Sequence, residues 1–131
     1  GAGFPGLVIA LLQKFHRVGE MHLIESDARK AAFLREVSRE TGAGAYIHSA
    51  RCEDVLPKLQ PDVMTSRAMA DLGQLFAYAQ PFVEKGAIGV FLKGRDVVAE
   101  LTKLSIPSNF QVVLNPSKTD PRAAIVQVRA I

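Results

Sequence analysis

The sequence predicts an α/β domain with a mostly parallel sheet, helices on both faces of the sheet and an antiparallel pair of strands at its C-terminal edge. Segments with helical spacing alternate with short apolar segments along most of the chain, a pattern typical of parallel sheets. Near the end, two apolar segments follow each other and are joined by a turn. The 131 residues suit one domain, and a hydrophobic fraction of 48% supplies its core.

The first predicted helix covers residues 5–18, because Pro5 suits a first helical turn and apolar residues follow at helical spacing. The spaced apolar residues are Leu7, Val8, Leu11, Leu12 and Phe15. Residues 21–25 are short, apolar and flanked by polar residues, which predicts a buried parallel strand.

The second predicted helix covers residues 27–40, with Ser26 as its N-cap. Its basic residues Arg29, Lys30, Arg35 and Arg39 lie largely away from its apolar face, as on a solvated surface. The glycine-rich residues 41–44 end this helix, and residues 45–48 form the next predicted strand.

The middle of the chain continues the alternation. Residues 51–60 read as a loop with a short helical turn, and residues 62–66 as a strand. Asp71 caps a helix that continues through Ala79, and residues 86–92 form a strongly apolar strand.

The last part of the chain contains a short helix over residues 96–104 and two consecutive strands at residues 110–114 and 124–129. The turn at residues 115–122 is short enough to join the two strands as an antiparallel pair.

Charge and composition permit a polyanionic partner without requiring one. Sixteen lysines and arginines against thirteen aspartates and glutamates give a net charge of +3. Cys52 is the sole cysteine, which excludes an internal disulfide and fits a reducing compartment. Because His16, His22 and His48 are scattered along the sequence, no metal site is predicted.

Apolar runs in the sequence are too short for a membrane span. The longest, residues 7–12 and 87–92, fall well below the roughly 18 residues that a span requires. No basic leader precedes Leu7, so no secretory signal is expected. We therefore expect a cytoplasmic protein without a membrane partner.

The chain opens on a G-x-G-x-x-G pattern formed by Gly1, Gly3 and Gly6, directly before the first predicted helix. Such glycines permit a tight turn and let an anionic cofactor approach the helix N-terminus, although glycine-rich turns also arise from packing alone. Glu25 ends the next strand, 19 positions after Gly6 (25 − 6), near the spacing at which a carboxylate binds ribose hydroxyls. Local capping of the following helix is the alternative role for Glu25. The pattern does not separate NAD from S-adenosylmethionine.

Six segments, in order and at matching spacing, resemble the bacterial small-subunit ribosomal RNA methyltransferase G family, also called glucose-inhibited division protein B. They are GAGFPGL at residues 1–7, LIES at 23–26, KAAFLREV at 30–37, RCED at 51–54, SRA at 66–68 and LKG at 92–94. The resemblance implies a class I S-adenosylmethionine-dependent methyltransferase with a Rossmann-like fold, which methylates N7 of a guanine in 16S ribosomal RNA.

The same resemblance assigns the cofactor-binding residues. Gly1, Gly3 and Phe4 would line the methionine end of S-adenosylmethionine, and Glu25 would bind its ribose. Cys52, which stands where the family has a small apolar residue, and Glu53 would flank the adenine.

Two catalytic residues also follow from the resemblance. Arg67 would lie beside both the cofactor and the target base, and Lys93 near the RNA side of the site. Judged from the residues alone, Lys93 is either a phosphate contact or a lysine that closes a strand. Guanine N7 exposes an in-plane lone pair, so the implied reaction requires alignment of the reactants and no general base.

The family fold begins with a strand and an acidic residue before the glycine loop, and this sequence contains neither. We therefore expect residues 1–131 to be a single methyltransferase domain that lacks its first strand, as the C-terminal part of a longer chain. The expected partner is 16S ribosomal RNA or a precursor of the small ribosomal subunit. The oligomeric state stays open, a monomer included. An NAD-dependent oxidoreductase and a non-catalytic ribosomal RNA-binding module of the same fold are the alternatives.

Overall fold

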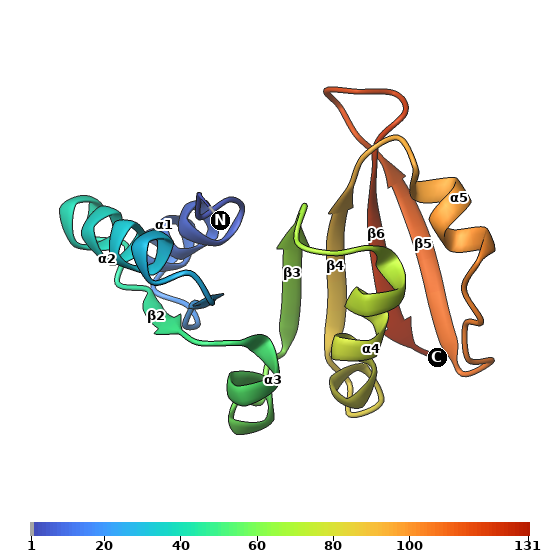
Figure 1. Ribbon diagram of the computed structural model, residues 1–131, viewed down its shortest axis with the longest axis horizontal. Helices are drawn as coiled ribbons and strands as arrows, with labels where there is room; N and C mark the ends of the chain where they lie inside the picture. Colours follow the sequence, from blue (N-terminus) through green and yellow to red (C-terminus); the bar gives the residue numbers. More distant parts are fainter. Residues whose placement is uncertain (1) are drawn as a thin grey trace. The chain divides into compact units, whose positions relative to one another are not determined.

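Strands form two separate sheets in the computed structural model, which describes residues 2–131 (Figure 1). The helical segments are α1 (Gly6–His16), α2 (Ala28–Thr41), α3 (Cys52–Val55), the 3₁₀ turn η1 (Leu56–Lys58), α4 (Leu72–Val83) and α5 (Val97–Thr102). The strands are β1 (His22–Glu25), β2 (Tyr46–Ser49), β3 (Val63–Arg67), β4 (Ile88–Lys93), β5 (Phe110–Pro116) and β6 (Ala124–Ala130). The chain divides into two compact units, the first ending at Leu59 and the second covering Gln60–Ile131.

In the first unit, α1 and α2 pack against one face of the parallel pair β1–β2. The register aligns His22 with Tyr46 and Glu25 with Ser49, so both strands end at the same edge. Alternate strand residues supply the core with both helices: Leu7, Ala10, Leu34 and Ala43 are buried, with Met21, Leu23, Val37, Ala45 and Ile47 packed against them.

Two glycines let α1 approach its neighbours closely. A Cβ atom on Gly6, the first residue of α1, would collide with the Leu23 side chain of β1. A Cβ atom on Gly3, whose φ is +89°, would collide with the side chains of Leu7 and Leu34. Packing of the helix against these side chains therefore favours glycine at both positions, whatever ligand the loop binds.

The N-cap of α2 is Asp27, and the prediction of Ser26 for this role was wrong by one residue. The Asp27 carboxylate accepts hydrogen bonds from the backbone N–H groups of Arg29 and Lys30, at 2.9 and 3.0 Å. A carboxylate at this position also interacts favourably with the positive end of the helix dipole.

The second unit contains a four-stranded sheet in the order β3-β4-β6-β5. The pair β3–β4 is parallel, whereas β6 runs antiparallel to both β4 and β5. This arrangement confirms the predicted α/β fold class with an antiparallel C-terminal pair. It adds that β6 joins the pair to the parallel strands and leaves β5 at the edge.

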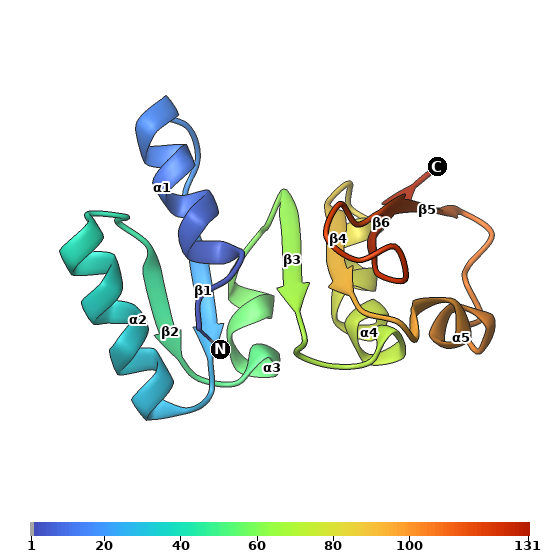
Figure 2. The same ribbon diagram turned by 90° about the horizontal axis from the view of Figure 1, so that it is seen from above.

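Helices α4 and α5 lie on the same side of this sheet (Figure 2), so within this unit the helices cover one face, whereas the sequence predicted helices on both faces of the sheet. Asp71 caps α4 as predicted, because its carboxylate accepts a hydrogen bond of 2.9 Å from the Gln74 N–H group. The largest fully buried side chains of the molecule lie in the core beneath the two helices: Phe91, Leu72, Val83, Val126 and Val128.

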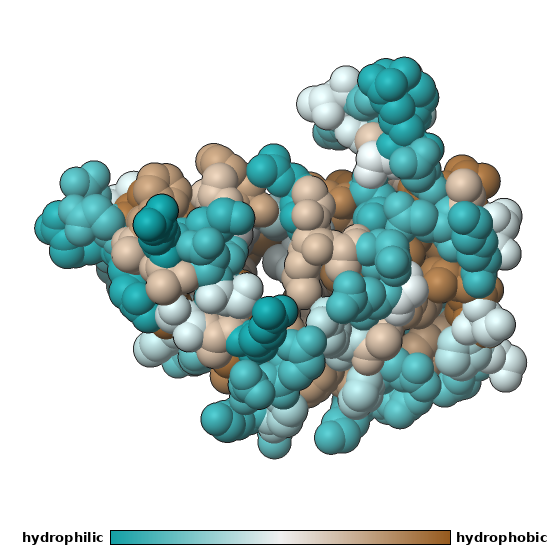
Figure 3. All heavy atoms as spheres, viewed as in Figure 1, coloured by the Kyte–Doolittle hydropathy of each residue, from teal (hydrophilic) through white to brown (hydrophobic). Residues whose placement is uncertain are grey.

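The turn between β5 and β6 is polar, and it projects at the top of the space-filling view (Figure 3). Within it, the Arg122 guanidinium contacts the Asp120 carboxylate at 3.1 Å. Among residues 2–131, no helix has both the length and the apolar character that crossing a membrane requires.

Candidate functional site

The first unit brings three of the predicted cofactor-binding residues to one sheet edge. Glu25 is the last residue of β1, and its carbonyl accepts a hydrogen bond of 3.2 Å from the Ala50 N–H group, just after β2. Cys52 and Glu53 follow at once as the first residues of α3. Ligands of open α/β sheets bind outside the carboxyl ends of the strands, and all three residues lie at that edge.

The Glu25 carboxylate has a local structural role at this edge. Its Oε1 atom accepts a hydrogen bond of 3.0 Å from the Asp27 N–H group, which precedes α2. The alternative role of Glu25, a local contact with the start of the following helix, is therefore confirmed for its Oε1 atom. A carboxylate has about four acceptor sites, so this bond is compatible with a further role toward hydroxyl groups.

The Cys52 thiol is protonated at neutral pH. Burial raises its pKa, and the negative charges of Glu53 and Glu25 raise it further. A neutral thiol is a poor nucleophile.

The glycine loop is only partly within the described residues, because Gly1 lies outside them. Gly3 adopts the left-handed conformation that favours glycine, and its carbonyl accepts a hydrogen bond of 2.6 Å from the Leu7 N–H group. Phe4 is 55% exposed, so this large apolar side chain is accessible to a ligand or to another surface.

The second unit places Arg67 and Lys93 at the carboxyl edge of its parallel strands. Arg67 ends β3 and pairs in register with Leu92, and Lys93 is the last residue of β4. Because successive residues alternate across a strand, Arg67 and Lys93 belong to opposite faces of the sheet. The sequence predicted a catalytic role for each, Arg67 beside the cofactor and the target base and Lys93 near the RNA side, and these roles stay predictions.

Lys93 lies in a polar network on the side of the sheet that α4 and α5 cover. Its side chain is 11% exposed, and its Nζ atom donates to the Ala70 carbonyl and to the Glu100 carboxylate, both at 3.0 Å. The same Glu100 oxygen accepts a hydrogen bond of 2.7 Å from the Leu72 N–H group. Sequence reasoning missed Glu100, because only the packing of α5 beside α4 brings its carboxylate to this lysine.

One polar atom beside Arg67 is buried without a partner. The hydroxyl of Ser66, in the SRA segment, has no hydrogen-bond partner among the described residues. A buried hydroxyl without a hydrogen-bond partner is uncommon. It lowers the free energy of unfolding, because the group loses its hydrogen bonds to water.

Two of the three histidines meet in the first unit, although they are far apart in the sequence. The Nδ1 atom of His22 lies 3.0 Å from Nε2 of His48, and the His22 ring also stacks on Tyr46. Burial lowers the pKa of His48, and the neighbouring His22 lowers it further. Within residues 2–131 no group of three or more histidine, cysteine or acidic side chains is arranged to hold a metal ion.

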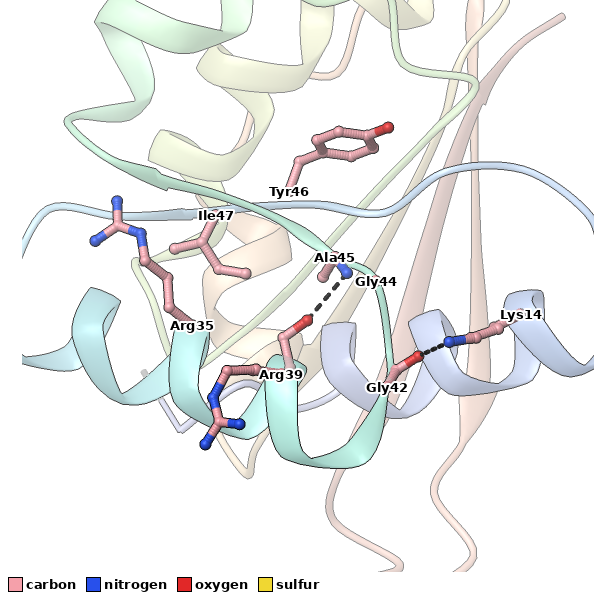
Figure 4. Close-up of a pocket in the computed structure, with 9 residues that line it drawn as sticks. Lys14, Arg35, Arg39, Gly42, Gly44, Ala45, Tyr46 and Ile47 are labelled. Carbon is pink, nitrogen blue, oxygen red and sulfur yellow. Dashed lines mark hydrogen bonds between the residues drawn. The ribbon is translucent and has the colours of Figure 1, made fainter.

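A pocket of the first unit lies at the other end of its strands. It has a volume of about 550 Å³ and lies beside Tyr46, the first residue of β2 (Figure 4). Two of its basic side chains have partners within the protein: Lys14 donates to the Gly42 carbonyl at the end of α2, and Arg39 pairs with Glu36 at 2.5 Å. Cations at helix C-termini are stabilising by themselves, so this pocket gives no reason to move the candidate site.

Comparison with known proteins identifies the family. Residues 1–120 match the family model described as rRNA small subunit methyltransferase G. A protein of Caulobacter vibrioides named "Ribosomal RNA small subunit methyltransferase G" is 40% identical over 131 residues, which is all of this chain and 60% of that protein. A relative of the same name from Rhodospirillum centenum is 47% identical over 132 residues, or 58% of its length.

A solved structure supports the fold. A mutant of MtNAS in complex with S-adenosylmethionine superposes with a TM-score of 0.68 at 18% identity, over 98% of this chain and 52% of that one. The chain spans about 60% of the length of the curated relatives it matches. On the match of the family model and of these relatives, the chain belongs to the rRNA small subunit methyltransferase G family.

Proposed function

We propose that this chain is part of an S-adenosylmethionine-dependent methyltransferase that methylates N7 of a guanine in 16S ribosomal RNA. The observation that carries the proposal is the family match over residues 1–120, which includes every predicted site residue. Naked 16S RNA and a precursor of the small subunit are both candidate substrates, and a bacterial enzyme of ribosome assembly would act in the cytoplasm. In this proposal both units belong to one methyltransferase domain.

The described residues fit S-adenosylmethionine in their chemistry. Glu25 ends β1 with a carboxylate, a group that accepts hydrogen bonds from ribose hydroxyls, and Gly3 presents backbone without a side chain at the loop. The neutral thiol of Cys52 and the neighbouring Glu53 would flank the adenine, while Phe4 with Gly1 and Gly3 would line the methionine end. When bound, S-adenosylmethionine supplies a methyl group on a positively charged sulfur.

In this proposal the protein accelerates the reaction by positioning the target guanine against the cofactor. Guanine N7 already carries an in-plane lone pair, so none of the described residues has to act as a general base. Arg67 cannot accept a proton, and its guanidinium would instead hold the target base in line with the cofactor. Surrounding apolar side chains such as Phe4 would exclude water from the reacting atoms.

Methyl transfer by the full-length protein is the direct test. We expect labelled methyl groups from S-adenosylmethionine to enter undermodified 16S RNA at a guanine N7. Arg67→Ala should reduce incorporation strongly, because the base then loses its positioning cation. Arg129→Ala is the matched control. Arg129 is an exposed arginine that donates a hydrogen bond of 2.6 Å to the Gln111 side chain, and neither residue is one of the predicted site residues.

Other outcomes would select the alternatives. Binding of S-adenosylmethionine without any methyl incorporation would favour a non-catalytic ribosomal RNA-binding module. Tight binding of NADH in calorimetry, with no response to S-adenosylmethionine or S-adenosylhomocysteine, would overturn the proposal in favour of an oxidoreductase. Wild-type rates for Arg67→Ala would remove Arg67 from the site.

A further inference from the structure

The segment between β3 and α4 leaves the sheet through an unusual turn. Arg67 is the last residue of β3, and the next residue, Ala68, has a φ of +51°. Residues with a Cβ atom rarely adopt this left-handed conformation, so the surrounding structure has to hold it in place. Residues 68–71, which we call the β3–α4 loop, therefore need an anchor close to Arg67.

A lysine and a glutamate from two other elements anchor this loop. Lys93, at the end of β4, donates from Nζ to the Ala70 carbonyl within the loop at 3.0 Å. Glu100, on α5, accepts from Lys93 Nζ at 3.0 Å and from the Leu72 N–H group at 2.7 Å, through the same oxygen atom. The loop is thus held at Ala70 and at the residue that follows its end.

The location of the Glu100 carboxylate strengthens its hydrogen bond with the Leu72 N–H group and its ion pair with Lys93. Leu72 is the first residue of α4, and its N–H group is one of the donors that a helix leaves without an internal partner. A carboxylate at that end also interacts favourably with the helix dipole. Since the side chains of Lys93 and Glu100 are only 11% and 24% exposed, removal of one partner leaves the other as a poorly solvated charge.

We propose that Glu100 and Lys93 form a clamp that positions the β3–α4 loop and, through it, Arg67. The inference rests on the proposed function in one respect, namely that Arg67 acts on the methyl-transfer site. In the clamp, Lys93 is a positioning residue of the LKG segment and does not itself contact RNA. Glu100, which no motif of the sequence marked, is its required partner.

Hydrogen exchange in the full-length protein tests the clamp without reference to activity. Glu100→Gln retains the side-chain shape and removes the charge, so we expect exchange at Leu72 and in the β3–α4 loop to accelerate by about tenfold or more. Lys93→Met should have the same effect, and Lys93→Arg should restore most of the protection because a guanidinium also donates to both acceptors. Glu84→Gln is the control, since Glu84 lies at the other end of α4 and contacts Gln80. Unchanged exchange in Glu100→Gln would overturn the proposal.

Methyl-transfer kinetics distinguish positioning from a general loss of structure. We expect Glu100→Gln to lower kcat by about tenfold, and to have less than about a twofold further effect in a protein that already carries Arg67→Ala. Losses that multiply in the double variant would overturn the link to Arg67. If the wild-type protein transfers no methyl group, the proposed function fails, and the exchange measurement still decides whether the clamp exists.

Discussion

The substitution Gly6→Ala tests the physical reason for the last glycine of the opening loop. Gly6 is the first residue of α1, and a Cβ atom at this position would collide with the Leu23 side chain. Leu23 in turn packs against the core of the first unit, so it has little room to withdraw. We therefore expect the added methyl group to push α1 away from β1.

The expected magnitude follows from two opposing effects. Overpacking a well-filled contact costs about 1–3 kcal/mol. Replacing glycine by alanine inside a helix contributes up to about 1 kcal/mol in the other direction, and less at a first helical residue. The net loss should be about 1–2 kcal/mol, and each kcal/mol lowers Tm by roughly 2–4 °C for a protein of 150–250 residues, the length range of the full-length relatives.

Thermal unfolding of the full-length protein, followed by circular dichroism, measures this loss. Gly94→Ala serves as the matched control, because nothing lies within 4 Å of a Cβ atom at Gly94. In a Leu23→Ala background the effect of Gly6→Ala should disappear, since the colliding side chain is gone. A Tm for Gly6→Ala equal to or above that of the wild-type protein would refute the packing argument.

Three further predictions concern the core and the titrating groups. Phe91→Ala should lower the free energy of unfolding by about 3–5 kcal/mol in urea titrations, because the ring is buried at 2% exposure; a loss below about 1 kcal/mol would contradict this. Burial and the neighbouring imidazole lower the pKa of His48, so the unfolded chain binds its proton more tightly and stability should fall as the pH drops below about 6.5. His48→Gln should flatten that dependence in urea titrations at different pH, and identical slopes for both proteins would speak against it. Burial and nearby carboxylates raise the pKa of Cys52, so iodoacetamide should alkylate it more slowly at neutral pH than it alkylates a free cysteine thiol, and an equal rate would contradict the buried environment.

The order of elements was predictable because its signals are local. Apolar spacing marked all the helices and strands of the second unit, and the observed bounds differ from the predicted ones by a few residues at most, as for α4, which continues to Val83. The cap of α2 moved from Ser26 to Asp27, because both side chains are good caps and only the backbone geometry selects between them.

Predictability was lower for the candidate site. Glu25 ends β1 and Arg67 ends β3, within one residue of the predicted strand ends, because strand ends follow from the element order; the site roles assigned to the two residues stay predictions. The partner of Lys93 was not predictable, because Glu100 reaches it only through the packing of α5. The same limit applies to the contact between His22 and His48, which depends on the register of two strands.

The sequence by itself determined the α/β class, the family resemblance and the residues that the resemblance assigns. Each of these depends on spacing along the chain, which folding does not change. The tertiary structure decided which side chains meet: the carboxylate that neutralises Lys93, the packing reason for Gly6 and the contact between His22 and His48. Such contacts depend on strand register and helix packing. Register and packing are set by interactions between separate segments of the chain, so no single segment predicts them.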